Sequence, residues 1–208
     1  MSTSYSSSLQ QASSATARWP AFCRSSRRPS CRRRPRRDSL SRQVASNGHL
    51  LAVLLNPPSA SSGARSRGAV RRAAGVLGFD GYEVANLFAD PTPTVVELNL
   101  LSAHEMSWPE LQQRLSEQLR AAHGVLAAWG VAGASGNFRR ARGERAAWLI
   151  EEAERRGHRH FWTVGGEPRH PSRWHQYVAD KHGRATGGTF EERLVQVLTL
   201  QPLGSVEA

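Results

Sequence analysis

Two proline-containing loops carry the side chains of this chain that are best suited to chemistry. The first is Asn56-Pro57-Pro58-Ser59, and the second runs from Gly165 to Ser172 and includes Arg169 and His170; each follows a short apolar run. An asparagine amide can orient a water molecule, and an imidazole can stabilise developing negative charge or bind a carbonyl oxygen. An arginine in the same loop can bind phosphate. The loops therefore predict a site without identifying its substrate.

The second loop has the composition of a rigid connection. Gly165 and Gly166 allow the backbone to turn sharply, and Pro168 and Pro171 restrict the backbone and exclude a helix. We therefore expect His170 to be held in place and to act at the site. The alternative is a surface histidine in a rigid turn.

Three other polar side chains each admit two interpretations. Asn56 orients a water molecule, or it bonds its own backbone in a turn beside Pro57, and both remain open. Arg169 binds phosphate, or it is a solvated arginine. Asn86 lies in the apolar run 82–88, where an amide needs hydrogen-bond partners. We expect it to read the edge of a ligand, with a loop carbonyl as the alternative partner.

Further positions are expected to line the same site. Gly130 is the first residue of a glycine-rich loop over residues 130–137. The backbone amides of this loop bind an anion, or the loop is simply flexible. Trp174 follows the histidine loop and is the tryptophan best placed to stack on a base. The residues expected to bind substrate are Pro57, Asn86, Gly130, Arg169, Ser172 and Trp174, and those expected to act on it are Asn56 and His170. The histidines form no compact metal-binding pattern, so we expect no metal and no cofactor.

The hydrophobic pattern alternates between strands and helices. Continuous apolar runs predict four buried strands, at residues 49–55, 82–88, 125–129 and 159–164. Helical spacing predicts four helices, at residues 66–77, 107–122, 142–156 and 190–198. This order predicts an α/β fold of the Rossmann-like type, a three-layer α/β/α sandwich around a four-stranded, mainly parallel sheet.

Such a sheet would bring the polar residues together. Parallel strands end at the same edge, where ligands bind in open α/β sheets. Asn56, Asn86, Gly130 and His170 each lie at or just after the end of a predicted strand. We therefore expect these four residues around one cleft.

The net charge of +11 comes mainly from the N-terminal segment. Residues 1–50 contain ten arginines and one acidic residue, whereas residues 51–208 contain 18 basic and 16 acidic residues. A basic tail can bind phosphate non-specifically without a designed role. The charge is therefore weak evidence that the folded part binds nucleic acid.

Composition also divides the chain into three parts. Residues 1–45 are rich in serine and arginine and are expected to be disordered; the α/β domain is expected at 46–202 and a C-terminal tail at 203–208. Three interpretations of the basic segment compete: a nucleic-acid arm, a transit peptide and an upstream extension without function. Its arginines lack amphipathic spacing, which favours an extension without function. Both cysteines lie in it, so the domain is expected to use no disulfide, which suits a cytoplasmic protein. No apolar run is long enough to span a membrane.

Five motifs follow one another in an order that matches a known family. They are Leu54-Leu55-Asn56-Pro57 with Ser59-Ala60, Arg71-Arg72, residues 83–89, Ala128-Trp129-Gly130 and Pro168-Arg169-His170-Pro171. Over residues 49–200 the chain resembles the bacterial family called domain of unknown function 1643 (DUF1643). Relatives in that family tend to carry an acidic residue after the first strand, whereas this chain has none between Asp38 and Asp80. Asn56 can then orient a water molecule but cannot accept its proton.

A more distant resemblance is to the uracil-DNA glycosylases. Their layout includes a proline-containing loop that positions water, a strand-end asparagine that reads the base and a final His-Pro-Ser loop, to which Asn56-Pro57, Asn86 and His170-Pro171-Ser172 are similar. The resemblance implies glycosylase-like hydrolysis of a nucleobase, nucleotide or nucleic acid, with Asn56 positioning water and His170 stabilising charge. The alternative is a non-catalytic nucleotide or nucleic-acid binding module on the same fold.

Overall fold

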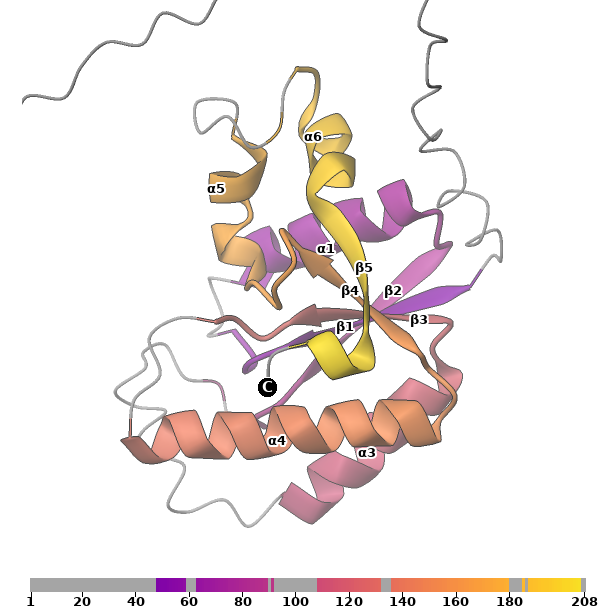
Figure 1. Ribbon diagram of the computed structural model, residues 1–208, viewed down its shortest axis with the longest axis vertical. Helices are drawn as coiled ribbons and strands as arrows, with labels where there is room; N and C mark the ends of the chain where they lie inside the picture. The colour runs from indigo at the N-terminus through magenta and orange to yellow at the C-terminus, as the bar shows by residue number, and fades with distance from the viewer. Residues whose placement is uncertain are drawn as a thin grey trace, which may run out of the picture. The chain divides into compact units, whose positions relative to one another are not determined.

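The structure, a computed structural model, describes residues 48–58, 63–89, 91, 108–131, 136–179, 185 and 187–206. All of them belong to the unit Arg37–Ala208. The described chain is an α/β fold with a five-stranded sheet in the order β2-β1-β3-β4-β5 (Figure 1). The strands are β1 His49–Leu54, β2 Gly81–Asn86, β3 Gly124–Ala128, β4 His160–Val164 and β5 Leu198–Pro202. The helices are α1 Gly63–Leu77, α3 Trp108–Ala121, α4 Gly136–Arg155, α5 His175–Val178 and α6 Phe190–Val197.

The four strands predicted from the apolar runs are present and pair in parallel. β1 pairs with β2 on one side and β3 on the other, and β3 pairs with β4. All residues of β1 after His49 are buried, as a central strand covered on both faces requires. The sheet therefore brings the C-terminal ends of these four strands to one edge.

A fifth strand corrects the prediction of a four-stranded sheet. β5 pairs antiparallel with β4, with Trp162 opposite Leu200, so the sheet is mixed. The last helix was predicted to include Leu198, but it ends at Val197 and the strand begins at once. Packed structure also continues beyond Pro202, the end expected for the domain, because Leu203 and Val206 are buried.

Helices cover both faces of the sheet and bury alternate residues of its strands. One hydrophobic cluster joins Leu51 and Val53 of β1 to α3 and α4, and the other joins Leu50 and Ala52 to α1 and α6. Figure 1 shows α3 and α4 together on one side and α1, α5 and α6 on the other. This arrangement follows from the two-residue period of a strand, which points successive side chains to opposite faces.

Two helices begin earlier than the hydrophobic spacing indicated. α1 starts at Gly63 rather than at residue 66, and α4 starts at Gly136 rather than at residue 142. The first turn of α4 includes Phe138, which is buried against Phe88 with ring centroids 5.1 Å apart. The first residue predicted for α3, Ser107, lies outside the described residues.

In the described part of the chain, no helix combines the length and the apolar character needed to cross a membrane. The longest, α4, has 20 residues but carries charged side chains along its length.

Candidate functional site

The predicted site residues leave four neighbouring strands at the same edge of the sheet. Asn86 ends β2, Asn56 follows β1, Gly130 follows β3 and His170 follows β4, in the order in which the strands lie. Asn86 is in register with Leu54, the last residue of β1. Residues 59–62, 92–107 and 132–135, which follow β1, β2 and β3 in the sequence, lie outside the described residues.

Gly130 and His170 are in direct proximity. The amide of Gly130 donates a hydrogen bond to the carbonyl of Pro168 at 2.5 Å. Gly130 has a φ of +89°, and a side chain there would place its Cβ 3.5 Å from the Cβ of His170. The positive φ therefore favours glycine at this position, and the histidine loop lies within ordinary van der Waals distance of the end of β3.

The hydrogen bonds of His170 determine which of its ring nitrogens is protonated. Nδ1 accepts the backbone N–H of Ser172 at 3.3 Å and lies 2.9 Å from its hydroxyl. Because a backbone N–H can only donate, the neutral ring carries its proton on Nε2. Burial of the ring, and secondarily the nearby Arg173, lower the pKa of His170 below its ordinary value of 6.5. At neutral pH His170 is thus an uncharged donor through Nε2.

Lowering the pH is expected to destabilise the fold through His170. In the unfolded protein the His170 ring binds a proton near pH 6.5, whereas in the folded protein it does so only at lower pH. Between these two pKa values the unfolded state therefore binds more protons than the folded state. The free energy of unfolding should therefore fall as the pH drops from 6.5 to the folded pKa, and this contribution should stay constant below it. Urea denaturation as a function of pH measures the slope.

The variant His170→Asn provides the control, because asparagine cannot titrate. In that variant the slope of unfolding free energy against pH should be shallower just below pH 6.5. Equal slopes in the two proteins would contradict a lowered pKa at His170.

Asn86 has an unsatisfied polar atom at the end of β2. Its Oδ1 is buried and accepts no hydrogen bond within the described structure. The backbone on its C-terminal side is nevertheless ordered by pairing, since Leu87 N–H donates to Leu54 O at 2.9 Å. A buried amide oxygen without a partner is costly, so Asn86 has the local property expected of a residue that receives a ligand.

Asn56 has a hydrogen bond of the kind expected for a turn residue. Its Nδ2 donates to the carbonyl of Pro57 at 3.3 Å. Pro58 packs against the first residue of α1, where a Cβ on Gly63 would lie 2.4 Å from the proline Cγ. The loop after β1 is therefore closely fitted to the start of α1, and Asn56 stays a predicted site residue.

Arg169 is held by protein groups. Its Nη2 forms an ion pair with Glu167 at 2.6 Å, and its guanidinium lies 3.9 Å from the centre of the Tyr177 ring. Its Nε is buried without a hydrogen-bond partner in the described structure. These contacts favour a role in shaping the loop, with one polar atom left for a ligand.

The expected stacking role of Trp174 is wrong. The side chain is fully buried in the cluster with α1 and α6, so no base can reach its ring. Its Nε1 donates to the carbonyl of Arg169 at 2.7 Å. The indole therefore anchors the backbone next to His170 from beneath. The sequence places a tryptophan close to the histidine loop, but it does not show whether the ring is buried or faces a ligand.

Two arginines of α4 contact this edge, and one of them, Arg145, was missed by the sequence analysis. Arg145 donates from Nη1 to the carbonyl of Leu87 at 2.7 Å, and Arg142 donates from Nη1 to the carbonyl of Gly130 at 3.2 Å. Arg145 is only 7% exposed. In the sequence, both lie in a run of arginines that is typical of a solvated helix face.

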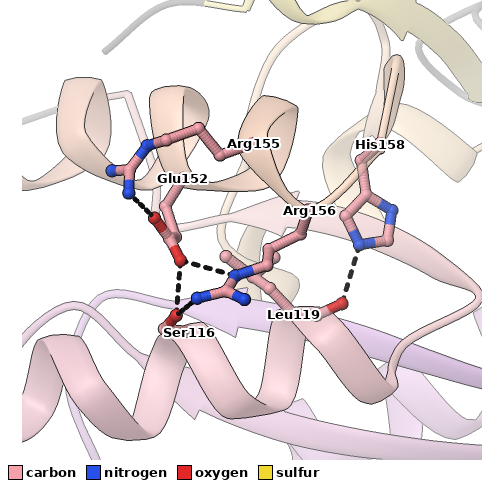
Figure 2. A network of polar contacts seen from close by, with 6 residues as sticks. All are labelled: Ser116, Leu119, Glu152, Arg155, Arg156 and His158. Carbon is pink, nitrogen blue, oxygen red and sulfur yellow. Dashed lines mark hydrogen bonds and ion pairs between the residues drawn. The ribbon is translucent and has the colours of Figure 1, made fainter.

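A second polar network lies between α3 and α4, away from the strand ends. Figure 2 shows Glu152 of α4 at its centre, held by Arg155, Arg156 and the hydroxyl of Ser116. Burial alone would raise the pKa of Glu152, but hydrogen bonds from Ser116 and Arg156 and the charges of the two arginines outweigh it, so the pKa is lowered from 4.5. The carboxylate is ionised and links the two helices.

A hollow of about 260 Å³ adjoins this network. Its lining residues are Gln113, Ser116, Glu117, Arg120 and Arg156. Both signs of charge are present, and Arg156 also donates to Ser116 Oγ at 2.6 Å. The side chains that border the hollow are thus largely engaged with each other.

Metal ligands do not gather in the described residues: no three His, Cys, Asp or Glu side chains lie close enough there to hold an ion. His158, one of the histidines near the network, instead places Nε2 2.8 Å from the carbonyl of Leu119 (Figure 2). It closes the C-terminal turn of α3.

The family described as "Protein of unknown function (DUF1643)" matches residues 37–172. The chain belongs to the DUF1643 family. No curated protein and no solved structure matches it. The DUF1643 match spans β1 to the histidine loop, and thus all four strand ends of the candidate site, while Trp174, α6 and β5 lie beyond it.

Proposed function

We propose that this DUF1643 domain binds a nucleobase as part of a nucleotide or nucleic acid, and that it hydrolyses the glycosidic bond in the manner of the uracil-DNA glycosylases. The observation that carries the proposal is the pairing of an acceptor and a donor at one sheet edge. Asn86 supplies an unsatisfied Oδ1, and neutral His170 supplies Nε2–H. A nucleobase carries C=O and N–H groups of the kinds that bond such a donor and such an acceptor.

The chemistry assigned to each residue follows from its protonation state. A neutral imidazole that donates through Nε2 can stabilise negative charge developing on a base carbonyl as the bond to the sugar breaks. Asn56 would orient the attacking water, with no proton acceptor supplied by its own loop. The bond between base and sugar therefore has to break before the water attacks. His170, which stabilises the departing anionic base, then contributes more to the reaction than Asn56, which orients the water.

Arginines near the helix starts support a phosphate-bearing ligand. Arg65 and Arg67 of α1 and Arg139 of α4 are exposed, and neither helix has an acidic residue in its first turn. Arg67 Nη1 folds back to within 3.0 Å of the place where a Cβ on Gly63 would lie. Cations at helix N-termini are electrostatically unfavourable, and a bound phosphate would offset this.

The second candidate is a binding module without catalysis on the same scaffold. The absence of an acidic residue in the loop after β1 favours it. Single-stranded oligonucleotides containing one uracil, one hypoxanthine or only ordinary bases separate the two candidates. Retention of the oligonucleotide with release of the base supports hydrolysis, and retention without release supports the module. Equal, weak binding of all three would refute both.

Asn86→Leu is expected to raise the free energy of unfolding while abolishing preference among these oligonucleotides. Removing a buried oxygen that has no partner recovers about 1 kcal/mol, because its desolvation is no longer uncompensated. Thermal or urea denaturation measures the gain, and fluorescence polarisation measures binding. Asn86→Asp is the matched variant: it keeps the shape but cannot donate, so it should change which base is preferred.

A loss of stability in Asn86→Leu with base preference intact would contradict the recognition role. In that case the amide would be a structural group of β2, satisfied by contacts within the protein.

A further inference from the structure

Helix α4 fixes the backbone at two of the four strand ends. Arg142 and Arg145 are three residues apart and therefore lie on neighbouring positions of one helix face. Arg145 bonds the carbonyl of Leu87, directly after Asn86, and Arg142 bonds the carbonyl of Gly130. Helix α4 thus contacts the backbone beside Asn86 and the backbone at Gly130.

The guanidinium of Arg145 has little freedom to move. It lies 4.2 Å from the ring centre of Phe88 and 4.4 Å from that of Trp108. A planar guanidinium can stack on such rings and donate in its own plane at the same time, which a lysine ammonium cannot. Its hydrogen bond to Leu87 therefore has a defined direction.

The peptide groups that follow Asn86 are held at both ends. Leu87 N–H is bonded to Leu54 O of β1, at 2.9 Å, and its carbonyl is bonded to Arg145 at 2.7 Å. Phe88 N–H donates to the next carbonyl of the β1 segment, that of Leu55, at 2.9 Å. With its C-terminal neighbour fixed in this way, the backbone of Asn86 is held in place on that side.

The second contact of α4 leads to His170. Arg142 holds the carbonyl of Gly130, whose N–H in turn holds the carbonyl of Pro168, two residues before the histidine. A chain of hydrogen bonds thus runs from Leu87 through α4 to Pro168.

We propose that Arg145 is a positioning residue that fixes the direction of the Asn86 amide, and that α4 sets the distance from this amide to His170 through Arg142. The consequence for ligand binding rests on the proposed function, whereas the effect on Asn86 is a property of the protein alone. This difference permits two independent measurements.

The first measurement follows the side-chain amide of Asn86 by NMR in the ¹⁵N-labelled full chain. Its signal is assigned by its disappearance in Asn86→Leu. In Arg145→Lys we expect the signal to shift and its order parameter to fall, while the remaining spectrum stays that of a folded protein. Arg140→Lys is the matched control, because Arg140 is an exposed residue of the same helix, paired with Glu144; it should leave the signal unchanged.

A second variant keeps the test decisive if Arg145→Lys does not fold. Trp108→Leu removes one of the two rings beside the guanidinium but leaves the arginine itself. It should also lower the order parameter of the Asn86 amide. An Asn86 signal identical to that of the parent protein in either folded variant overturns the proposal.

The second measurement uses binding of the uracil oligonucleotide. Arg145→Lys should weaken binding of this oligonucleotide about tenfold. An amide that is no longer held in place loses conformational freedom when the ligand binds, and this loss lowers the affinity. A disturbed Asn86 amide in a protein whose parent binds no oligonucleotide would support positioning and refute the proposed function. An undisturbed amide with binding and base preference intact would refute positioning and leave the proposed function standing.

Discussion

Replacing Trp174 with alanine is expected to lower the free energy of unfolding by about 4 kcal/mol, the usual loss for a buried aromatic side chain. The indole is fully buried between the sheet and the helices α1 and α6. Its removal leaves a large cavity and also leaves the carbonyl of Arg169 without its donor. Urea denaturation monitored by circular dichroism measures the change.

Trp174→Phe separates the hydrogen bond from the volume. Phenylalanine fills most of the space but cannot donate to Arg169, so we expect a loss of about 1–2 kcal/mol from the unsatisfied carbonyl. The histidine loop should also loosen, moving the pKa of His170 back toward 6.5. Trp162→Phe on β4 is the control for ring size. A Trp174→Phe variant no less stable than this control would contradict the anchoring role.

Replacing Glu152 with alanine is expected to destabilise the domain by about 2 kcal/mol. Removing one partner of a buried ion pair costs 3–5 kcal/mol when the other charge stays buried. Here Glu152 is 2% exposed but Arg155 and Arg156 are 61% and 38% exposed, so water can solvate them again. The expected loss is correspondingly smaller, and chemical denaturation at neutral pH measures it.

The effect of Glu152 must depend on pH. Its folded pKa is lowered from 4.5, so its stabilising contribution is present above that value and is lost as the pH falls through the folded pKa. The difference in stability between the parent protein and Glu152→Gln should therefore shrink in acid. Glu154→Gln is the matched control, because Glu154 is exposed and paired with Arg159; it should cost about 0.5 kcal/mol or less. A pH-independent difference would contradict the ionised network.

The parallel part of the sheet could be predicted because its signals are local. Residues 50–54 form an uninterrupted apolar run, which indicates a strand buried on both faces. β5 gave no such signal, since Leu198 to Pro202 alternates in the manner of an exposed strand and follows α6 without any glycine or proline between them. Propensity alone cannot locate a helix end that is set by pairing with β4.

The placement of the candidate residues was predictable where it depends on topology and unpredictable where it depends on side-chain contacts. The sheet order places Asn86, Asn56, Gly130 and His170 at one edge because consecutive parallel strands must end there. The burial of Trp174 depends on three-dimensional packing that spacing does not reveal. Arg145 was missed for a related reason: among many arginines, nothing in its neighbours indicates that its charge lies between two aromatic rings.

The antiparallel strand at the C-terminus has a consequence for how the chain can be shortened. The family match ends at residue 172, within the histidine loop, but β5 covers one whole side of β4 and Leu194 of α6 completes the cluster beneath Trp174. A chain cut at that boundary would expose the hydrogen-bonding groups of β4 from His160 to Val164 to other molecules. Such open strands invite intermolecular pairing and aggregation. The segment matched by the family model thus ends before the strand that completes this sheet.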